Sequence, residues 1–288
     1  MAASPVRLTN PDKLLWRDIS KADLRDYYEA AATRLMPFVA NRPLTIIRAP
    51  DGFKGEVFYQ RHAMKGMSKL IGTVKVKGEP KPYLMITSAE ALPALAQIAA
   101  VEIHPWASTA SALEQPDYLT FDLDPDKGLS FADLRRAAFD MRDYLHRLGL
   151  GAFLKVTGGK GLHVVAPLQP RAEWEEAKEF ARALVEAMAA DKPDAYTTNV
   201  RKARRKGRVF LDYLRNGRTA TAVAAWSPRA REGAPIAVPI AWSFIEKKRA
   251  VPRFTLDRAA AAFKTADPWK DYERACRPLP SLEALKKL

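Results

Sequence analysis

Residues 116–126, PDYLTFDLDPD, place two carboxylates inside an apolar run. In a β-strand, successive side chains point to opposite faces, so the apolar residues would face a core while Asp122 and Asp124 share the other face. Their Cα atoms would lie roughly 7 Å apart and the carboxylates would repel unless a cation lies between them. Mg²⁺ takes one or two such carboxylates together with substrate phosphates. The alternative is a strand that ends in a turn at Asp124 before Pro125.

The composition indicates a globular protein with a polyanionic partner. The 288 residues are 48% hydrophobic and 28% charged, with a net charge of +14. Nucleic acid is a better candidate than a membrane, because no basic amphipathic helix, membrane-spanning apolar run or signal-peptide pattern occurs. A soluble protein that is merely basic is the alternative. The single cysteine, Cys276, excludes an internal disulfide, and the four scattered histidines argue against a zinc cluster.

Periodicity predicts helices interleaved with β-hairpins. The expected helices are 19–35 with Ser20 as N-cap, 89–100, 130–150 and 172–191. The expected strands are 44–50 with 56–62, two strands within 152–168, and 208–217 with 218–226 joined by an Asn-Gly turn. We expect an α+β fold, a mainly antiparallel central sheet with flanking helices. A single domain is expected over 1–288, with an N-terminal region (1–105), a catalytic core (106–250) and a C-terminal helical region (251–288).

The stretch 155–164, KVTGGKGLHV, combines glycines with donors of hydrogen bonds. Three glycines would let backbone N–H groups approach an anion closely, and a Lys and a His would add charge and donors. These residues are Gly158, Gly159, Gly161, Lys160 and His163. The G-x-x-x-x-G-K-[ST] spacing of a Walker A loop is missing, and a strand follows. A plain hairpin with a glycine turn is the alternative.

The stretch 201–218 holds eight Lys or Arg and one acid, Asp212. In the strand VFLDYL, Asp212 lies on the face opposite its apolar neighbours. It is either part of a structural ion pair or the third ligand of a two-metal site. Two ions roughly 3.5–4 Å apart can activate an attacking hydroxyl and stabilise a leaving pyrophosphate. Three acids, a phosphate nest and a basic loop together predict nucleotidyl transfer.

An ordered series of motifs resembles the polymerase domain of bacterial DNA ligase D, the end-joining member of the archaeo-eukaryotic primase superfamily. The motifs are LTNPDKLLW, ISKADLRDYYEAAA, RPLTIIRAPDG, VEIHPWAS, DYLTFDLDPD, KVTGGKGLHVVAPL, GRVFLDYLRN and TAVAAWSPRAREGAPIAVPIAW. They run almost from end to end of the chain. The resemblance implies a primase-like α+β fold and a template-directed nucleotidyltransferase. Such an enzyme adds nucleotides, preferably ribonucleotides, to 3′ ends for gap filling in double-strand-break repair by non-homologous end joining.

The resemblance also implies an active site. Asp122, Asp124 and Asp212 would bind two divalent ions, Mg²⁺ or Mn²⁺, and His104 would lie near the metals and the incoming nucleotide. Asp212 would help to bind the metal that activates the primer 3′-hydroxyl. Seven residues would hold the nucleotide: Thr157, Gly158, Gly159, Lys160, His163, Arg229 and Arg231. Thr157 stands where the family usually has serine, and the hydroxyl is kept.

Five further residues are expected to contact DNA. Lys13 and Lys21 match lysines that bind the 5′-phosphate of the downstream strand, with solvated lysines as the alternative. Lys21 also falls in the first turn of a capped helix, where backbone N–H groups favour an anion. Phe58 and Tyr59 resemble an aromatic pair that stacks on template bases. Since one of two adjacent strand residues normally faces the core, we expect only one to stack. Arg205 resembles a mobile-loop arginine that helps to order the active site.

The remaining expectations concern context. No K-x-D-G adenylation motif and no histidine cluster of a phosphoesterase module occur, so a polymerase domain alone is expected, either free-standing or within a larger protein. Expected partners are gapped or overhanging 5′-phosphorylated DNA ends, nucleoside triphosphates, Ku and a DNA ligase, but no membrane. The expected location is the cytoplasm of a bacterium or archaeon, at the nucleoid. Two alternatives stay open: a primase that starts chains de novo, and a non-catalytic module that bridges DNA ends.

Overall fold

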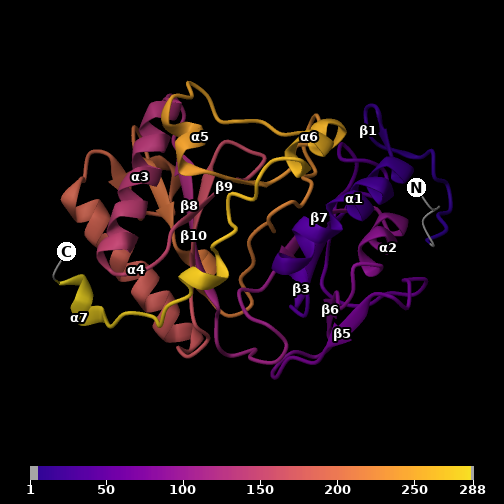
Figure 1. Cartoon of the computed structure of the whole chain (residues 1–288), viewed down its shortest axis with the longest axis horizontal. Coiled ribbons are helices and arrows are strands. Elements are labelled where there is room, and N and C mark those ends of the chain that lie inside the picture. Colours follow the sequence, from indigo (N-terminus) through magenta and orange to yellow (C-terminus); the bar gives the residue numbers. More distant parts are fainter. Residues whose placement is uncertain (1–5, 287–288) are drawn as a thin grey trace. The chain divides into compact units, whose positions relative to one another are not determined.

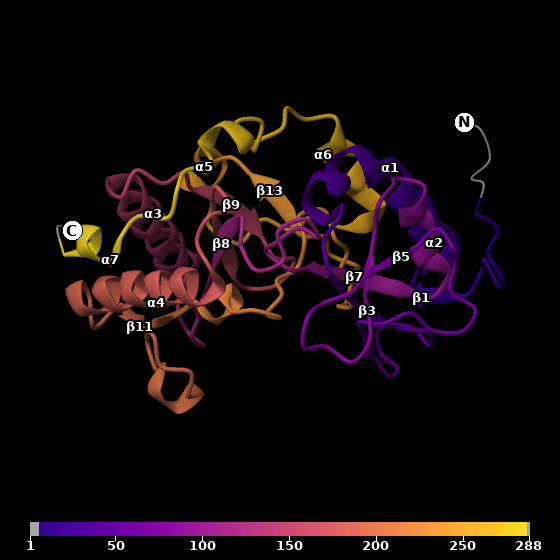
Figure 2. The same ribbon diagram turned by 90° about the horizontal axis from the view of Figure 1, so that it is seen from below.

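The computed structural model describes residues 6–286, which form two compact units (Figure 1; Figure 2). The first unit takes the described residues up to Ser111 together with Thr221–Val238 and Arg253–Ala266. The second takes Ala112–Ala220, Pro239–Pro252 and the described residues from Asp267 onward. A single domain over 1–288 stays a prediction. Among the residues that are described, no helix has the length and apolar character needed to cross a membrane.

The first unit is built on a five-stranded sheet with helices packed beside it. The path of the sheet is β4 (Phe58–Gln60), β3 (Leu44–Arg48), β6 (Tyr83–Met85) and β5 (Gly72–Val74), and β7 (Ala100–Pro105) pairs with β3. Its pairings are antiparallel. Helices α1 (Lys21–Val39) and α2 (Ala91–Gln97) pack on each other and on β7. The smaller elements are β1 (Leu14–Trp16), β2 (Ile19–Ser20), η3 (Leu256–Arg258) and α6 (Ala259–Phe263).

Helix α1 begins where its capping residues predict. Ser20 Oγ accepts a hydrogen bond from Asp23 N at 3.2 Å, and the Asp23 carboxylate accepts one from Ser20 N at 2.7 Å. This reciprocal capping satisfies donors that the first turn would otherwise leave unpaired. One face of the helix is buried, and Tyr28 on that face donates its hydroxyl hydrogen to Ala100 O of β7. The cap and the apolar stripe together fix the helix against the sheet.

The second unit carries a six-stranded sheet. The strand order is β11 (Tyr196–Thr197), β12 (Val209–Asp212), β8 (Tyr118–Pro125), β10 (Leu162–Pro167), β9 (Phe153–Val156) and β13 (Val238–Ile240). Strands β12, β8, β10 and β9 pair antiparallel, whereas β11 and β12 are parallel. Helices α3 (Phe131–Arg147) and α4 (Trp174–Asp191) contact the sheet and each other (Figure 1). The smaller elements are η1 (Lys202–Arg204), η2 (Leu214–Asn216), α5 (Trp242–Glu246), η4 (Glu273–Ala275) and α7 (Leu282–Leu285). The predicted α+β class is confirmed.

The predicted hairpin at the Asn-Gly dipeptide is wrong. After β12 the chain forms the short 3₁₀ helix η2, and residues 218–226 contain no strand. The reason lies in Asn216, which is 1% exposed. Its Oδ1 accepts from Thr120 N of β8 at 2.7 Å, and its Nδ2 donates to Thr120 O at 2.9 Å. The side chain therefore hydrogen-bonds to the backbone of β8 and is buried, instead of forming a hairpin turn.

Candidate active site

The three predicted metal ligands lie on neighbouring strands of the six-stranded sheet. In the register of the sheet, Asp122 of β8 is the partner of Asp212 of β12 and of His163 of β10. Asp124 follows two residues later and so shares the face of Asp122. The alternate residues Leu119, Phe121 and Leu123 are fully buried, as expected. The predicted alternation of β8 is therefore confirmed, and the sheet brings the acids together.

The carboxylates in this cluster are not fully neutralised. Burial, and then the charges of Asp122 and Asp212, raise the pKa of Asp124. Burial also raises the pKa of Asp212, against the opposing effects of the Leu214 amide and of Arg215. Arg215, which sequence analysis did not identify, has Nη2 3.7 Å from Asp122 Oδ2 and Nε 3.7 Å from Asp212 Oδ2. These distances are long for ion pairs, so Arg215 is only loosely placed between Asp122 and Asp212.

Because Gly161 has no side chain, the carboxylates of Asp122 and Asp124 can lie close to its backbone. A Cβ atom at this position would lie 2.8 Å from Leu123 O, 3.2 Å from Asp124 Oδ1 and 3.4 Å from Asp122 Oδ1. The same point is thus close to one oxygen of each carboxylate. Any larger residue would push into the backbone of β8 or displace the acids. The glycine is therefore required by a close approach between the loop and the two carboxylates.

The predicted phosphate loop is a turn closed by Thr157. The Thr157 hydroxyl donates to Gly161 O at 3.1 Å and accepts from Gly159 N at 3.3 Å. Gly158 has a φ of +72°, a conformation that glycine adopts without strain. Lys160 is exposed at the turn. Thr157 therefore shapes the loop, and its direct contact with a phosphate stays a prediction.

His163 is placed beside the acids rather than in solvent. It is 3% exposed, and its Nε2 lies 3.4 Å from Asp122 Oδ1. Burial lowers the pKa of His163 to about 4, against the raising effect of Asp122. Burial therefore opposes the positive charge that was expected of His163. Its binding of the nucleotide stays a prediction.

The donor set suits hard divalent cations that are shared with a substrate. Within residues 6–286, no group of three or more His, Cys, Asp or Glu side chains could hold a metal ion by itself. Mg²⁺ is commonly bound by only one or two carboxylates, with substrate phosphates and water as the other ligands. The crowded carboxylates and the room left by Gly161 fit that arrangement. Mn²⁺ accepts the same oxygen donors.

A second cluster of charged side chains lies in the first unit, around Glu102 of β7. His104 Nε2 is 2.7 Å from Glu102 Oε2, and Arg229 Nε donates to the same oxygen at 2.9 Å. The backbone N–H of Ala230 donates to Oε1 at 2.8 Å. Sequence analysis identified His104 and Arg229 but missed Glu102. The spacing of Glu102 and His104, two residues apart in a strand, could have indicated that they share a face.

The two predicted arginines differ in their surroundings. The Arg229 side chain is 13% exposed and bound to Glu102, whereas Arg231 is exposed. Between them the backbone turns, and Arg231 N donates to Arg229 O at 2.7 Å. Arg229 is therefore held in a fixed position by the protein. The nucleotide-binding roles of both residues stay predictions.

Lys13 and Lys21 lie close together in the first unit, but with different partners. Lys13 Nζ is 2.9 Å from Asp51 Oδ1. Lys21 is 7% exposed, and its Nζ donates to Thr9 O at 2.9 Å and Gln97 Oε1 at 3.2 Å. Burial and the nearby Lys13 lower the pKa of Lys21. An ammonium group has three donors, so one remains for a phosphate.

The expectation that backbone N–H groups in the first turn of α1 bind an anion together with Lys21 is wrong. Lys21 N donates to Lys13 O and Ala22 N donates to Pro11 O, both at 2.9 Å. Asp23 N is bound by the Ser20 side chain. The first three N–H groups of the helix are thus occupied by the protein itself. Any anion here would be bound by the lysine side chains.

The remaining predicted DNA contacts lie on exposed elements. Phe58 is 39% and Tyr59 73% exposed, because β4 is an edge strand. The premise that one of the pair faces the core is therefore wrong, and stacking by only one of them stays a prediction. Arg205 follows η1, with its guanidinium carbon 3.6 Å from the ring centre of Phe210 and Nη2 donating to Val200 O at 2.7 Å. Its role in ordering the site stays a prediction.

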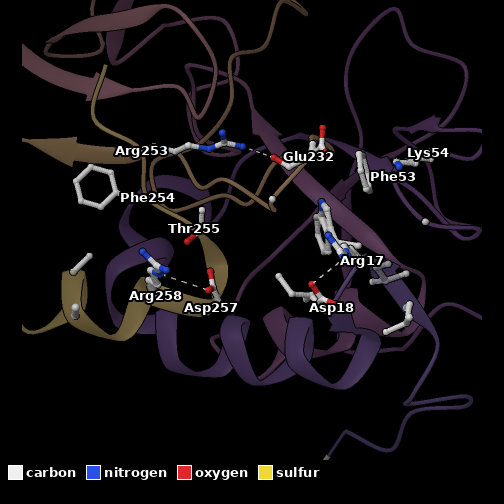
Figure 3. A pocket seen from close by; sticks show the side chains of 18 of the residues that line it. Arg17, Asp18, Phe53, Lys54, Glu232, Arg253, Phe254, Thr255, Asp257 and Arg258 are labelled. Atoms are coloured by element: carbon white, nitrogen blue, oxygen red, sulfur yellow. Dashed lines mark hydrogen bonds and ion pairs between the residues drawn. The ribbon is translucent and has the colours of Figure 1, made fainter. Parts of the chain in front are cut away.

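A large cavity of about 1130 Å³ lies elsewhere in the first unit (Figure 3). Its walls come from 14–19, 51–54, 232–233 and 253–265, and they carry four basic and four acidic side chains. Figure 3 shows two of the bases paired with the acids next to them in sequence, in the contacts Arg17–Asp18 and Arg258–Asp257. Among the described residues, none of those predicted for metal, nucleotide or DNA lines it. A balanced charge of this kind does not favour a polyanion.

Comparisons with known proteins agree with the motif pattern. The family model described as "LigD, primase-polymerase domain" matches residues 20–269. The "Multifunctional non-homologous end joining protein LigD" of Pseudomonas aeruginosa is 37% identical over 281 residues, 94% of this chain and 33% of that protein. The protein of the same name from Mycolicibacterium smegmatis is 31% identical over 246 residues, 83% of this chain and 32% of that protein. The chain thus spans about a third of the length of these two relatives.

A solved structure shares the fold. The "Polymerase Domain from Mycobacterium tuberculosis Ligase D in complex with DNA" has a TM-score of 0.86 and is 28% identical. The match covers 94% of this chain and 98% of that one. The similarity therefore extends over nearly all of both chains.

Proposed function

Because this chain belongs to the LigD primase-polymerase domain family, we propose that it is a template-directed nucleotidyltransferase that extends DNA 3′ ends. Its role would be to fill short gaps with nucleotides or ribonucleotides during double-strand-break repair by non-homologous end joining. The relatives are named for that pathway, and a solved relative is described in complex with DNA. The net charge of +14 suits a nucleic-acid partner.

The observation that carries the proposal is the acid cluster on β8 and β12. Asp122, Asp124 and Asp212 are held on one sheet beside the glycine turn, and burial, followed by the charges of the other two acids, raises the pKa of Asp124. A protein gains nothing in stability from such a cluster, because burying like charges together is unfavourable. Perturbed carboxylates of this kind are characteristic of functional sites. A site for divalent cations explains why they are retained.

The residues of the chain have separate tasks in this proposal. Bound divalent ions would lower the pKa of the primer 3′-hydroxyl and stabilise the leaving pyrophosphate. Asp122 and Asp124 would hold the ion shared with the triphosphate, and Asp212 the ion at the primer end. His163, neutral and buried, would keep Asp122 in place. The backbone of the 157–161 turn and Lys160 would bind phosphate oxygens.

The remaining predicted residues would act on substrate and DNA. Arg229 and Arg231 would bind the triphosphate, with His104 beside them. Lys13 and Lys21 would bind a 5′-phosphate on the downstream strand. Phe58 or Tyr59 would stack on template bases, and Arg205 would help to order the site. We further propose Ku and a DNA ligase as partners and the cytoplasm, at the nucleoid, as the location.

The experiment that tests this function is primer extension on a gapped duplex whose downstream strand carries a 5′-phosphate. We expect addition of the nucleotide complementary to the template, only with Mg²⁺ or Mn²⁺ present. Parallel reactions compare UTP with dTTP opposite adenine, and we expect UTP to be used more efficiently. Absence of templated addition with either metal would refute the proposal.

Two controls separate the alternatives. Synthesis on a single-stranded template without a primer would indicate a primase that starts chains de novo. Bridging of two DNA ends, measured by energy transfer between dyes, without any nucleotide addition would indicate a non-catalytic module. The complete set of three acids favours the enzyme over this module.

A further inference from the structure

Glu102 is a buried carboxylate that organises the backbone and side chains around it. Its side chain is 4% exposed, and three donors converge on it: His104 Nε2, Arg229 Nε and Ala230 N. His104 follows it by two residues in β7, whereas Arg229 lies far along the chain. Such a carboxylate would be costly to bury without these partners. Although burial alone raises the pKa of Glu102, the bond from His104 and the charge of Arg229 lower it overall.

The segment that carries Arg229 has little regular structure of its own. Trp226 has a φ of +66° and Ala234 one of +41°, both unusual for residues with side chains. Residues 224–230 are tied to β7 by several hydrogen bonds, of which Ala224 N to Ile103 O at 2.9 Å is the first. Ser227 Oγ accepts from Ile103 N at 2.8 Å, and Glu102 accepts from Arg229 and Ala230. Glu102 therefore contributes to the path of this segment through Ala230 and orients the arginine.

We propose that Glu102 is a positioning residue for the incoming nucleotide: it holds the His104 ring and the Arg229 guanidinium in the orientation that triphosphate binding requires. This inference rests on the proposed function. Glu102 acts through its two partners and does not itself contact the nucleotide. Because one carboxylate oxygen accepts from both side chains, a change at Glu102 moves both together.

The geometry also sets the chemistry of the His104 ring. An ionised Glu102 accepts from Nε2, so Nε2 carries a hydrogen, and any further hydrogen bond of the ring is made by Nδ1. In the neutral ring Nδ1 is then an acceptor, and only the protonated ring offers a second donor. The protonation of Nε2 is a signature that can be measured in the unmodified protein.

The test begins with Glu102→Gln, which keeps the size of the side chain. The amide has one oxygen, so it cannot replace both carboxylate oxygens. If the amide oxygen faces His104 and Arg229, the NH₂ group faces the Ala230 N–H, which is also a donor. If the amide is flipped, the NH₂ group faces the donors of His104 and Arg229 instead. We expect KM for the nucleotide to rise about tenfold or more, as for small misplacements of binding groups, with a smaller change in kcat. Binding of gapped DNA stays as in the wild type.

The matched control is Glu29→Gln, which removes one negative charge from an exposed position of α1 in the same unit. We expect this variant to keep the KM of the wild type. Equal KM values for Glu102→Gln and wild type, with primer extension intact, would overturn the inference while leaving the proposed function standing. Failure of the wild type to extend any primer would instead refute the proposed function.

A double-mutant cycle shows whether Glu102 acts through Arg229. We expect Glu102→Gln to have a much smaller effect on KM in an Arg229→Ala background, because the group it positions is already gone. Additive effects would contradict positioning. Nucleotide affinity is measured in parallel with a fluorescent triphosphate analogue, so the cycle can be completed for variants that do not turn over.

A measurement on the wild type keeps the inference testable if Glu102→Gln does not fold. Nuclear magnetic resonance of the ¹⁵N-labelled imidazole nitrogens, assigned with His104→Ala, reports which ring nitrogen of His104 carries hydrogen. We expect hydrogen on Nε2. A neutral ring with hydrogen only on Nδ1 would overturn the proposed contact with Glu102.

Discussion

The acid cluster on β8 and β12 and the cluster of charged side chains around Glu102 are electrostatic opposites. In the second unit, Asp124 and Asp212 face other acids, and burial together with this repulsion raises their pKa values. In the first unit, Glu102 is more deeply buried but has three donors, and its pKa is lowered. Around the acids of the second unit, Arg215 is only loosely placed and the pKa values stay raised, whereas Glu102 has close donors supplied by the chain. The cluster in which acids repel one another is the one suited to bind cations, and the cluster around Glu102 orients other side chains.

The largest effect is expected from removing an acid of the cluster on β8 and β12. Asp212→Ala should reduce nucleotide addition by about a thousandfold or more, because an ion at the reacting hydroxyl would be lost. DNA binding should persist, since the basic surface supplies it. Single-turnover primer extension and a DNA titration measure the two properties. Asp194→Ala, at an exposed position of the same unit, serves as the control and should keep wild-type activity.

A substantial but smaller effect is expected from filling the space beside the acids. Gly161→Ala introduces a Cβ atom 2.8 Å from Leu123 O and close to both carboxylates. We expect about a tenfold to hundredfold loss of nucleotide addition, because the acids must move. Gly217→Ala is the matched control, since its Cβ would have its nearest contact, at 3.7 Å, with the flexible Lys178 side chain. Equal activity of the two variants would show that the approach of Gly161 to the acids is unimportant.

The lysine pair of the first unit should affect DNA binding rather than chemistry. Wild type should bind a gap with a 5′-phosphate several-fold more tightly than one with a 5′-hydroxyl, because a terminal phosphate carries more charge and acceptor oxygens. Lys13→Ala with Lys21→Ala should remove this preference. Lys65→Ala with Lys69→Ala should weaken binding of both DNAs in a salt-dependent manner and keep the preference. Titrations of each protein with the 5′-phosphate and 5′-hydroxyl DNAs, at the same salt concentration, measure the preference. If it survives in the Lys13→Ala, Lys21→Ala variant, these lysines are not the phosphate site.

The smallest effect is expected on stability. Burial and then Asp122, Asp212, Arg205 and Arg215 determine the pKa of Asp124, which is raised overall. The ionised group therefore costs stability above its folded-state pKa, and this cost disappears as the pH falls below the ordinary aspartate range. Without metal at neutral pH, Asp124→Asn should raise Tm by up to a few degrees, and the gain should vanish in acid.

Asp126 is the control for Asp124, because its pKa is lowered instead of raised. It is partly exposed, and hydrogen bonds from the backbone of Gly207 and Lys127 lower its pKa. Asp126→Asn should therefore leave Tm unchanged or slightly lower at neutral pH, since exposed interactions contribute little. Thermal unfolding of both variants from acid to neutral pH measures the difference. A lower Tm for Asp124→Asn than for wild type at neutral pH would contradict the claim that the ionised Asp124 costs stability.

Local patterns in the sequence predict much of the fold. The predicted cap at Ser20 marks the start of α1. The predicted helix 130–150 is α3, and Gly149, with a φ of +75°, follows its end. The alternation around Asp122 predicts the buried and polar faces of β8 correctly. These features depend on residues close in sequence. The Asn-Gly signal fails because Asn216 bonds to a strand 96 residues away.

The candidate site is predictable only in part, for the same reason. Glu102 is bound by a residue 127 positions away, and Arg215 approaches Asp122 only because β12 pairs with β8. The charge of His163 depends on burial, which its neighbours in sequence do not reveal. The first N–H groups of α1 are occupied by the segment before β1. Each of these properties arises from tertiary contacts, whereas the residue types needed for metal and phosphate chemistry can be read directly.

Binding of Mn²⁺ tests the central claim most directly, because it requires no turnover. Electron paramagnetic resonance counts free Mn²⁺ during a titration of wild type and of the variant with Asp122→Asn and Asp212→Asn. A non-incorporable nucleoside triphosphate is present in one series and absent in the other. The acid cluster predicts that wild type binds Mn²⁺ more tightly when the nucleotide is present, and that the double variant loses this binding. Equal Mn²⁺ binding by the wild type and the double variant, with nucleotide present, would contradict the claim that these acids bind divalent ions.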